Sequence, residues 1–235
     1  MLKNICNVWK TSKSEFGIML IVLLASGVLG MFLMPILLYM DVEMPYIAFG
    51  ALIAVFLWLL INFILGLFGY QNNFDLIVSM GCRRKDFIIS QIVVVYINLL
   101  LELGIVGLVY VLEKMLYQVV YSSYEMFDIT VYILKPKIML VLFLLIPAFR
   151  LLIGAFILKY KKKAFWIIWA IWMLGSFGSG RLIPYLAHHP KNWLWQCVLS
   201  MINLPGSVQM LMVLLLTIVM LSGTYLLMRK QAVYV

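Results

Sequence analysis

The chain has 235 residues, of which 66% are hydrophobic and only 11% are charged, and its net charge is +9. Its mean hydropathy of +1.09 excludes a water-soluble globular domain, because a surface of this composition would aggregate in water, so the surrounding solvent is lipid. Nucleic-acid binding is excluded as well, since the basic residues flank apolar runs instead of gathering on a folded polar surface.

The N-terminal segment, residues 1–16, predicts an amphipathic helix that lies along the membrane surface. Its apolar residues fall roughly on one helical face, and the lysines fall elsewhere. A basic amphipathic helix with a tryptophan at its apolar edge is typical of the headgroup region. A disordered basic tail is the alternative interpretation. The apolar face consists of Leu2, Ile5, Cys6, Trp9 and Phe16.

Six apolar runs follow, each long enough for the ~20 residues that a helix needs to cross a bilayer. They and their short links use most of the chain, so residues 1–235 are expected to form one transmembrane domain. The predicted fold class is an all-α polytopic membrane protein. The expected spans are 17–40, 46–69, 87–112, 138–159, 164–183 and 207–228.

Basic residues are distributed unevenly between the two sides that these spans define. Twelve of the 18 fall on the side that holds both termini and the links after the second and fourth spans. The positive-inside rule therefore predicts a multi-pass protein with both termini in the cytoplasm. The twelve are Lys3, Lys10, Lys13, Arg83, Arg84, Lys85, Lys159, Lys161, Lys162, Lys163, Arg229 and Lys230.

The link between the second and third spans, residues 72–86, has the pattern of a short helix followed by a sharp basic turn. Asn73 is a good helix cap, and Asp75 suits the positive end of a helix dipole. Gly81 is a C-terminal stop, and after the basic residues Asp86 can cap the next span. The basic residues are Arg83, Arg84 and Lys85. An ordinary positive-inside loop with an incidental helical turn is the alternative.

An apolar face distinguishes this link from a plain loop. Phe74, Ile77 and Val78 follow the i, i+3, i+4 spacing of one side of a helix. Such a face needs cover from either the membrane surface or a partner protein, and the local pattern does not choose between them.

Two charged residues lie within predicted spans. Glu102 is in the third and Arg150 in the fourth, and an isolated charge at such a depth costs roughly 2.5–3.5 kcal/mol on insertion scales. Their expected depths differ by about 10 Å or less at a rise of ~1.5 Å per residue. This similarity predicts a structural Glu102–Arg150 pair, and a role in lining a substrate path is the alternative.

Glycine pairs predict where helices approach each other closely. Small residues at a helix interface allow two backbones to come together, although the spacing here is not that of the GxxxG motif. The pairs are Gly27 with Gly30, Gly66 with Gly69, and Gly104 with Gly107.

The segment between the last two spans, residues 184–206, predicts a re-entrant or interfacial structure at the outer face. It contains an apolar run of about a dozen residues, which is too short to cross a bilayer, and Trp193 and Trp195 suit headgroup depth. An aromatic loop without further role is the alternative. His188 and His189 are adjacent, so their side chains diverge on a helix and do not predict a metal site.

Catalytic patterns are missing from the sequence. It contains no G-x-x-x-x-G-K-[ST] phosphate loop, no H-E-x-x-H and no G-x-S-x-G. We therefore expect no enzymatic activity, no metal and no cofactor in this chain. A membrane enzyme would also need paired carboxylates or a nucleophile with its base.

The segment "FDLIVSMGCRRKDF", with a small residue, a basic pair and an aromatic-led span after a two-helix opening, resembles the intracellular loop of small bacterial ABC exporter permeases of the type-2 class. The layout of the whole chain is similar to these permeases too. The resemblance implies a coupling helix in residues 72–86 that contacts a separate ATPase subunit. The residues assigned to that contact are Asn73, Phe74, Asp75, Ile77, Val78, Gly81, Arg83, Arg84, Lys85 and Asp86.

The same resemblance implies the rest of the assembly. The chain would lie in the bacterial cell membrane with a second permease copy or a homologue, while ATP and magnesium would bind in the partner ATPase. It would export an amphipathic substrate, either a peptide of the antimicrobial or toxin class or a lipid-like molecule, by alternating access. The alternative function is a non-transporting immunity or assembly protein of the membrane that binds one partner.

Overall fold

Six helices make up the part of the chain that the computed structural model describes, and no strand occurs within that part. The described residues are 2–39, 47–79, 81–120, 135–188 and 204–229, with positions 193, 196 and 200. The helices are α1 (Leu2–Tyr39), α2 (Phe49–Ser79), α3 (Arg84–Val120), α5 (Pro136–Tyr160), α6 (Lys162–His188) and α8 (Gly206–Met228). The all-helical fold class is confirmed for this part.

Four of these helices are long and apolar enough to cross a membrane. The helix α2 is bent by 45° between Phe49–Leu65 and Phe68–Val78, and it adds a fifth candidate when the two halves are counted as one span. The four are Asn7–Leu37 within α1, Arg84–Val120, Lys137–Tyr160 and Gly206–Met228. Within the described residues, α6, which contains the expected span 164–183, is not in this set.

The expected surface helix at residues 1–16 is not a separate element, because α1 continues without a break from Leu2 to Tyr39. Val8 is fully buried against α2 and α3, and Ile5 and Trp9 pack against the same cluster. At Ile5 and Trp9, the described part of this face that borders the cluster, the segment therefore packs on protein. An amphipathic pattern shows that a face needs cover but does not identify what covers it.

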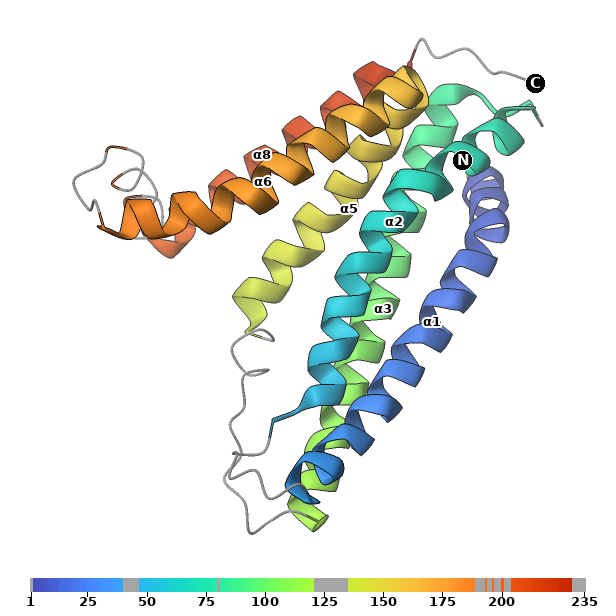
Figure 1. Cartoon of the computed structure of the whole chain (residues 1–235). Helices are drawn as coiled ribbons and strands as arrows, with labels where there is room; N and C mark the ends of the chain where they lie inside the picture. Colours follow the sequence, from blue (N-terminus) through green and yellow to red (C-terminus); the bar gives the residue numbers. More distant parts are fainter. Residues whose placement is uncertain are drawn as a thin grey trace.

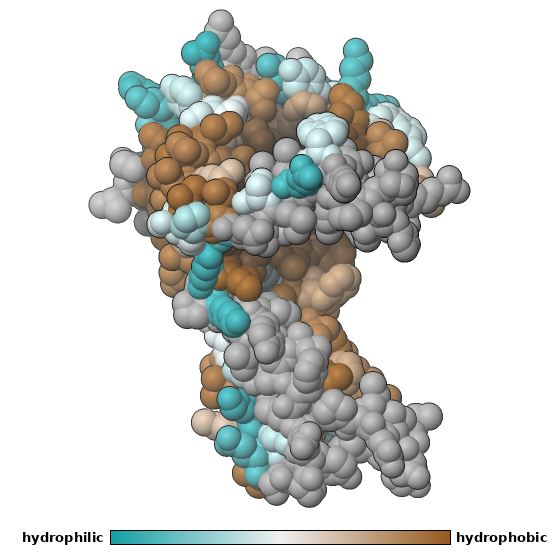
Figure 2. Space-filling model, turned by 90° about the vertical axis from the view of Figure 1, so that its left-hand side faces the viewer, coloured by the Kyte–Doolittle hydropathy of each residue, from teal (hydrophilic) through white to brown (hydrophobic). Residues whose placement is uncertain are grey.

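The helices α1, α2 and α3 run side by side, and α5 packs on α2 and α8 (Figure 1). The start of α1, the α2–α3 turn, the α5–α6 turn and the end of α8 all lie at the upper end in this view. Hydrophilic side chains gather at that end above a broad apolar band (Figure 2). This arrangement agrees with the predicted grouping of basic segments, and the cytoplasmic placement of that end stays a prediction.

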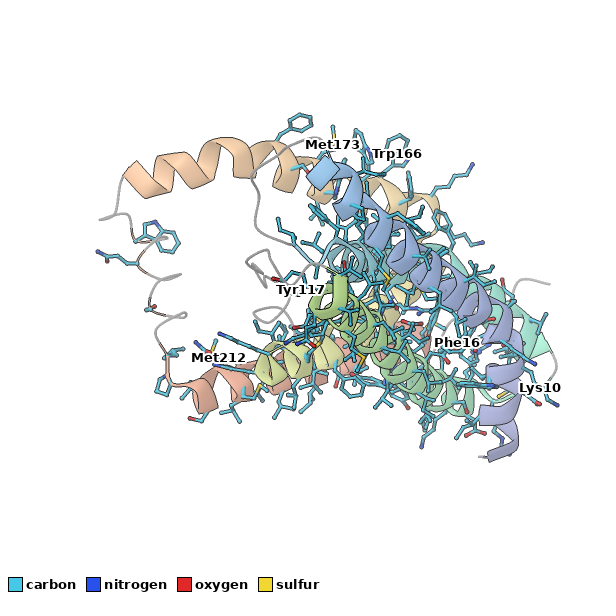
Figure 3. The ribbon with its side chains drawn as sticks, turned by 90° about the horizontal axis from the view of Figure 1, so that it is seen from below. Lys10, Phe16, Tyr117, Trp166, Met173 and Met212 are labelled. Carbon is cyan, nitrogen blue, oxygen red and sulfur yellow. The ribbon has the colours of Figure 1, made fainter. Side chains whose placement is uncertain are left out.

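The helix α6 has its main contact with α5, and it lies well apart from α8 when the bundle is viewed from below (Figure 3). Trp166 points outward from α6 and is 63% exposed. The expected re-entrant segment 184–206 begins within α6, and most of it, including Trp195, lies outside the described residues.

Two clusters of buried residues hold the bundle together. The loop-end core joins α1, α2, α3, α5 and α8 next to the α2–α3 turn, and Phe87 is its centre, with edge-to-face contacts to Tyr70 at 5.9 Å and Phe74 at 5.4 Å between ring centroids. The central core joins α1, α2 and α3 around Trp58. Its buried members are Met19, Leu23, Ala54, Val55, Trp58, Leu99 and Val106.

One of the predicted glycine pairs lies at a close helix contact. A Cβ atom at Gly30 would lie 2.2 Å from the Cα of Gly50, and one at Gly27 would lie 2.8 Å from the side chain of Val109. The helix α1 can therefore approach α2 and α3 only because both positions lack a side chain. Gly104 and Gly107 face open space, so the same prediction is wrong for that pair.

Candidate functional site

Arg150 on α5 is the centre of a buried polar network that reaches α1, α2 and α3. Its Nη1 donates a hydrogen bond to Asn62 Oδ1 at 3.1 Å, and its Nη2 lies 3.3 Å from Glu15 Oε2 in an ion pair. Arg150 is only 8% exposed. Because a lone charge within the apolar part of a bundle is costly, the carboxylate of Glu15 stabilises Arg150 at this position.

Glu102 on α3 belongs to the same network but is not the direct partner of Arg150. Its Oε2 accepts hydrogen bonds from Trp58 Nε1 and Asn62 Nδ2, both at 3.0 Å. Asn62 therefore lies between the two charged residues, with its amide nitrogen toward Glu102 and its oxygen toward Arg150. The predicted direct pair is wrong, although the similar depths of the two residues do place them in one network.

Glu15 links this network to the predicted coupling segment. Its Oε1 accepts a hydrogen bond from Asn73 Nδ2 at 3.3 Å. A Cβ atom at Gly69 would lie 2.8 Å from the same Glu15 oxygen, so the missing side chain lets the carboxylate approach α2. The network thus extends along α2 from Asn62 to Asn73, across the bend in that helix.

A second buried carboxylate, Glu113 on α3, holds the beginning of α2. Its Oε1 accepts from the backbone N–H of Gly50 at 2.9 Å, and its Oε2 accepts from that of Ala51 at 2.8 Å. The first N–H groups of a helix have no acceptor within the helix, and the positive end of its dipole favours an anion. Glu113 is fully buried and lies one residue beyond the expected end of the third span, 112, because α3 continues to Val120.

The predicted coupling segment, 72–86, contains the end of α2 instead of a separate short helix. Asn73 and Asp75 lie inside α2, so neither caps a helix as predicted. The predicted stop at Gly81 is confirmed. Its φ is +86°, its N–H bonds to the Val78 carbonyl, and the next N–H, of Cys82, reaches a carbonyl five residues back, as in a Schellman motif. Asp86 lies in the first turn of α3, which begins at Arg84, and is therefore not its cap.

The apolar face of this segment is covered by the chain itself. Phe74 is 0% and Ile77 is 2% exposed, and both belong to the loop-end core; Val78 packs against it. The interpretation that this face needs a membrane surface or a partner is therefore wrong. Arg83 and Lys85 are exposed, while Arg84 is partly buried. A direct contact of this segment with an ATPase stays a prediction and rests on its polar residues.

Cys82 lies in the turn itself, beside the exposed basic residues. Partial burial raises the pKa of its thiol, and the neighbouring carboxylate of Asp86 raises this pKa further. The thiol is therefore less nucleophilic at neutral pH than an ordinary exposed cysteine.

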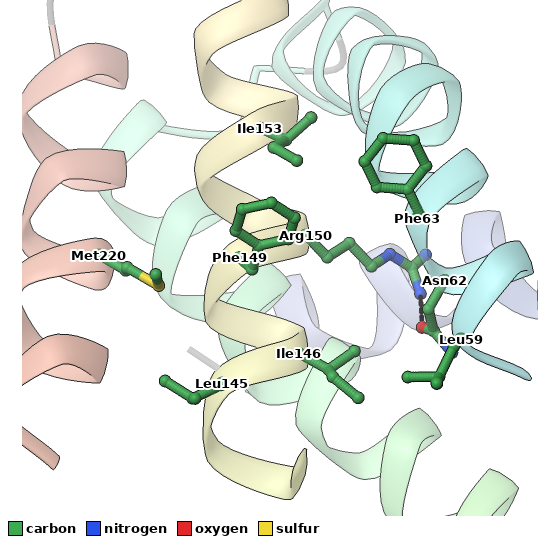
Figure 4. Close-up of a pocket in the computed structure, with 9 residues that line it drawn as sticks. All are labelled: Leu59, Asn62, Phe63, Leu145, Ile146, Phe149, Arg150, Ile153 and Met220. Atoms are coloured by element: carbon green, nitrogen blue, oxygen red, sulfur yellow. Dashed lines mark hydrogen bonds between the residues drawn. The ribbon is translucent and has the colours of Figure 1, made fainter. Parts of the chain in front are cut away.

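An apolar cavity of about 370 Å³ lies beside the network, between α2, α5 and α8 (Figure 4). Arg150 and Asn62 are its two polar lining residues, and the rest of its wall is hydrocarbon, aromatic or thioether. A second apolar cavity of about 420 Å³ between α5 and α6 shares Phe63, Phe149 and Ile153 with the first. This arrangement can hold an apolar chain with a polar group at one end. Within the described residues, no group of three or more His, Cys, Asp or Glu side chains is placed to hold a metal ion.

Several members of the site could not be recognised from the sequence pattern. Glu15 falls among lysines in a segment that reads as a surface helix, and Asn62 is a single amide in an apolar run. The one available signal is that Asn62 interrupts a long apolar stretch, since polar residues in such stretches usually face a partner. The sequence does not indicate that Glu113 is buried, because this residue lies beside Lys114 where a span was expected to end.

Comparison of the chain with protein-family models, with curated proteins and with solved structures finds no match.

Proposed function

We propose that this chain is the membrane subunit of an ATP-driven ABC exporter, and that the α2–α3 turn, residues 81–86, contacts a separate ATPase. The observation that carries the proposal is the anchoring of this turn. Phe74 on α2 packs edge-to-face on Phe87 of α3, and Val8 of α1 is buried in the same core. A force on the turn would therefore move the adjoining ends of three helices together.

The exposed charges of the turn fit this role. Arg83 and Lys85 are exposed, and the turn that holds them lies at the end of the bundle at which α1 begins and α8 ends. They would contact acidic groups of the ATPase. ATP and magnesium would bind in that partner. In the proposed assembly a second permease copy or a homologue completes the transport path, and α6 supplies the sixth span.

The proposed substrate is amphipathic, either a peptide of the antimicrobial or toxin class or a lipid-like molecule. The cavity between α2, α5 and α8 supports this class, because its wall is apolar apart from Arg150 and Asn62. A ligand would lay its apolar part along the wall and direct one polar group toward these two residues.

Co-expression with an ABC ATPase subunit tests the proposal. Arg83→Glu should abolish the stimulation of ATP hydrolysis by the membrane subunit and weaken co-purification. Lys163→Glu is the matched control, because Lys163 is also exposed, lies in the first turn of α6 at the same end, and undergoes the same change of charge. It should leave both quantities unchanged.

Two results would count against the proposal. Equal effects of the two variants would show that only the charge of this end matters. Stable binding of a partner without any change in its ATP hydrolysis would favour the immunity or assembly function instead.

A further inference from the structure

The charges of the buried network do not balance. Two carboxylates, Glu15 and Glu102, surround one guanidinium, that of Arg150. If both carboxylates were ionised, the network would carry a net charge of −1 in the apolar part of the bundle. An uncompensated buried charge is costly, and a buried acid usually neutralises instead.

The surrounding groups identify which carboxylate carries the excess charge. Glu15 is in direct ion contact with Arg150, and its side chain is 20% exposed. Glu102 is 2% exposed, and within the described part of the chain its Oε2 accepts hydrogen bonds from two neutral groups, Trp58 Nε1 and Asn62 Nδ2. The positive charge is thus nearer to Glu15, and ionisation is least favourable at Glu102.

A second, independent observation concerns Asn98, which lies one helical turn before Glu102 on α3. Its Oδ1 atom is buried and has no hydrogen-bond donor among the residues that the structure describes. Residues at i and i+4 are neighbours on a helix, and side chains lean toward its N-terminus, so Glu102 extends over the turn of Asn98. A proton on Glu102 would supply the donor that Asn98 lacks.

We propose that Glu102 is a proton-binding site, in which Oε1 carries a proton at neutral pH and donates a hydrogen bond to Asn98 Oδ1. The proton comes from hydronium in the adjoining water: one O–H bond of hydronium breaks and leaves water, and one O–H bond forms at the carboxylate. The charged groups that face this site are Glu15 from α1 and Arg150 from α5, while α2 contributes the neutral Trp58 and Asn62. With the proton bound, the network is neutral.

The proton also determines how firmly α3 is held. Loss of the proton would replace the donor to Asn98 by a bare carboxylate and would favour an arrangement that brings Arg150 or water to Glu102. Proton binding at this position would therefore bias how α3 sits against α2 and α5, whether or not an ATPase contacts the chain.

Infrared spectroscopy of the purified chain in lipid nanodiscs tests the proposal through the stretching band of protonated carboxyl groups. At neutral pH we expect a band equivalent to one carboxyl per chain that shifts when glutamate is ¹³C-labelled. Glu102→Gln should remove it. Glu15→Gln should also remove it, because Arg150 would then have only Glu102 as its counterion and Glu102 would ionise. Glu113→Gln, at a site outside the network, should keep it.

The variant Asn98→Leu is a separate test, because it leaves Glu102 itself unchanged. It removes the proposed acceptor, so the band should remain and move to the higher frequency of a carboxyl without a hydrogen bond. Absence of a glutamate band in the unmodified chain, its survival in Glu102→Gln, or an unchanged frequency in Asn98→Leu would each overturn the proposal.

Discussion

Glu113→Gln is expected to destabilise the bundle by releasing the beginning of α2. The carboxylate accepts two backbone N–H groups at 2.9 and 2.8 Å, from Gly50 and Ala51, and no water competes because Glu113 is fully buried. In glutamine one of the two carboxylate oxygens is replaced by an NH₂ group. The remaining oxygen can accept a hydrogen bond from one backbone N–H, and the NH₂ group would face the other. One lost charge-assisted hydrogen bond and one unpaired donor give a loss of about 2–3 kcal/mol in the free energy of unfolding.

Reversible unfolding in mixed micelles with increasing dodecyl sulfate measures this loss. Asp86→Asn is the matched control, because it also removes a carboxylate near a helix N-terminus, in a partly exposed first turn. It should cost less than about 1 kcal/mol. Hydrogen exchange at the amides of Gly50 and Ala51 gives a local readout, since Glu113→Gln should accelerate both. Equal losses for the two variants, or free exchange of these amides in the unmodified chain, would refute the reasoning.

Three further predictions concern packing and the turn. Gly30→Ala should lower the free energy of unfolding by about 1–3 kcal/mol in the same assay, because its Cβ would meet a backbone 2.2 Å away, whereas Gly104→Ala faces open space and should be neutral or slightly stabilising. Phe74→Ala should cost about 3–5 kcal/mol even without any partner, and Phe74→Leu less than about 1.5 kcal/mol; a small loss for alanine would show that the loop-end core is not closed. With the other two cysteines replaced by serine, maleimide should label Cys82 faster at neutral pH in Asp86→Asn, because removing this carboxylate lowers the thiol pKa and raises the thiolate fraction; an unchanged rate would contradict that electrostatic effect.

Much of the fold follows from composition and apolar run length. Each of the six predicted runs overlaps one of the six described helices, because about twenty apolar residues have few stable alternatives to a helix in lipid. The positions of helix ends are predicted less accurately where a helix continues through polar residues beyond its apolar run. Residues 2–16 and 70–79 continue α1 and α2 beyond the expected spans, because Val8, Phe74 and Ile77 pack in one core outside the long apolar runs.

The candidate site was predictable only in part, and for a physical reason. Charges inside apolar runs stand out, so Glu102 and Arg150 could be placed in one network from their depths alone. Their actual partners could not, because hydrogen bonds between helices depend on rotation and on approach distance. Glu15 reaches Arg150 from a segment that looks like a surface helix, and it does so against the bare backbone at Gly69.

The bend in α2 divides the network into two parts. Asn62 lies on the Phe49–Leu65 half, with Glu102 and Arg150, whereas Asn73 lies on the Phe68–Val78 half and bonds to Glu15. A pivot at this bend would stretch the Asn73–Glu15 hydrogen bond, which is already 3.3 Å long, and directional bonds fail beyond about 3.5 Å. Glu15 would then depend on Arg150 alone. Movement of the α2–α3 turn would thus reach Arg150 through Glu15, and only then alter the surroundings of Glu102.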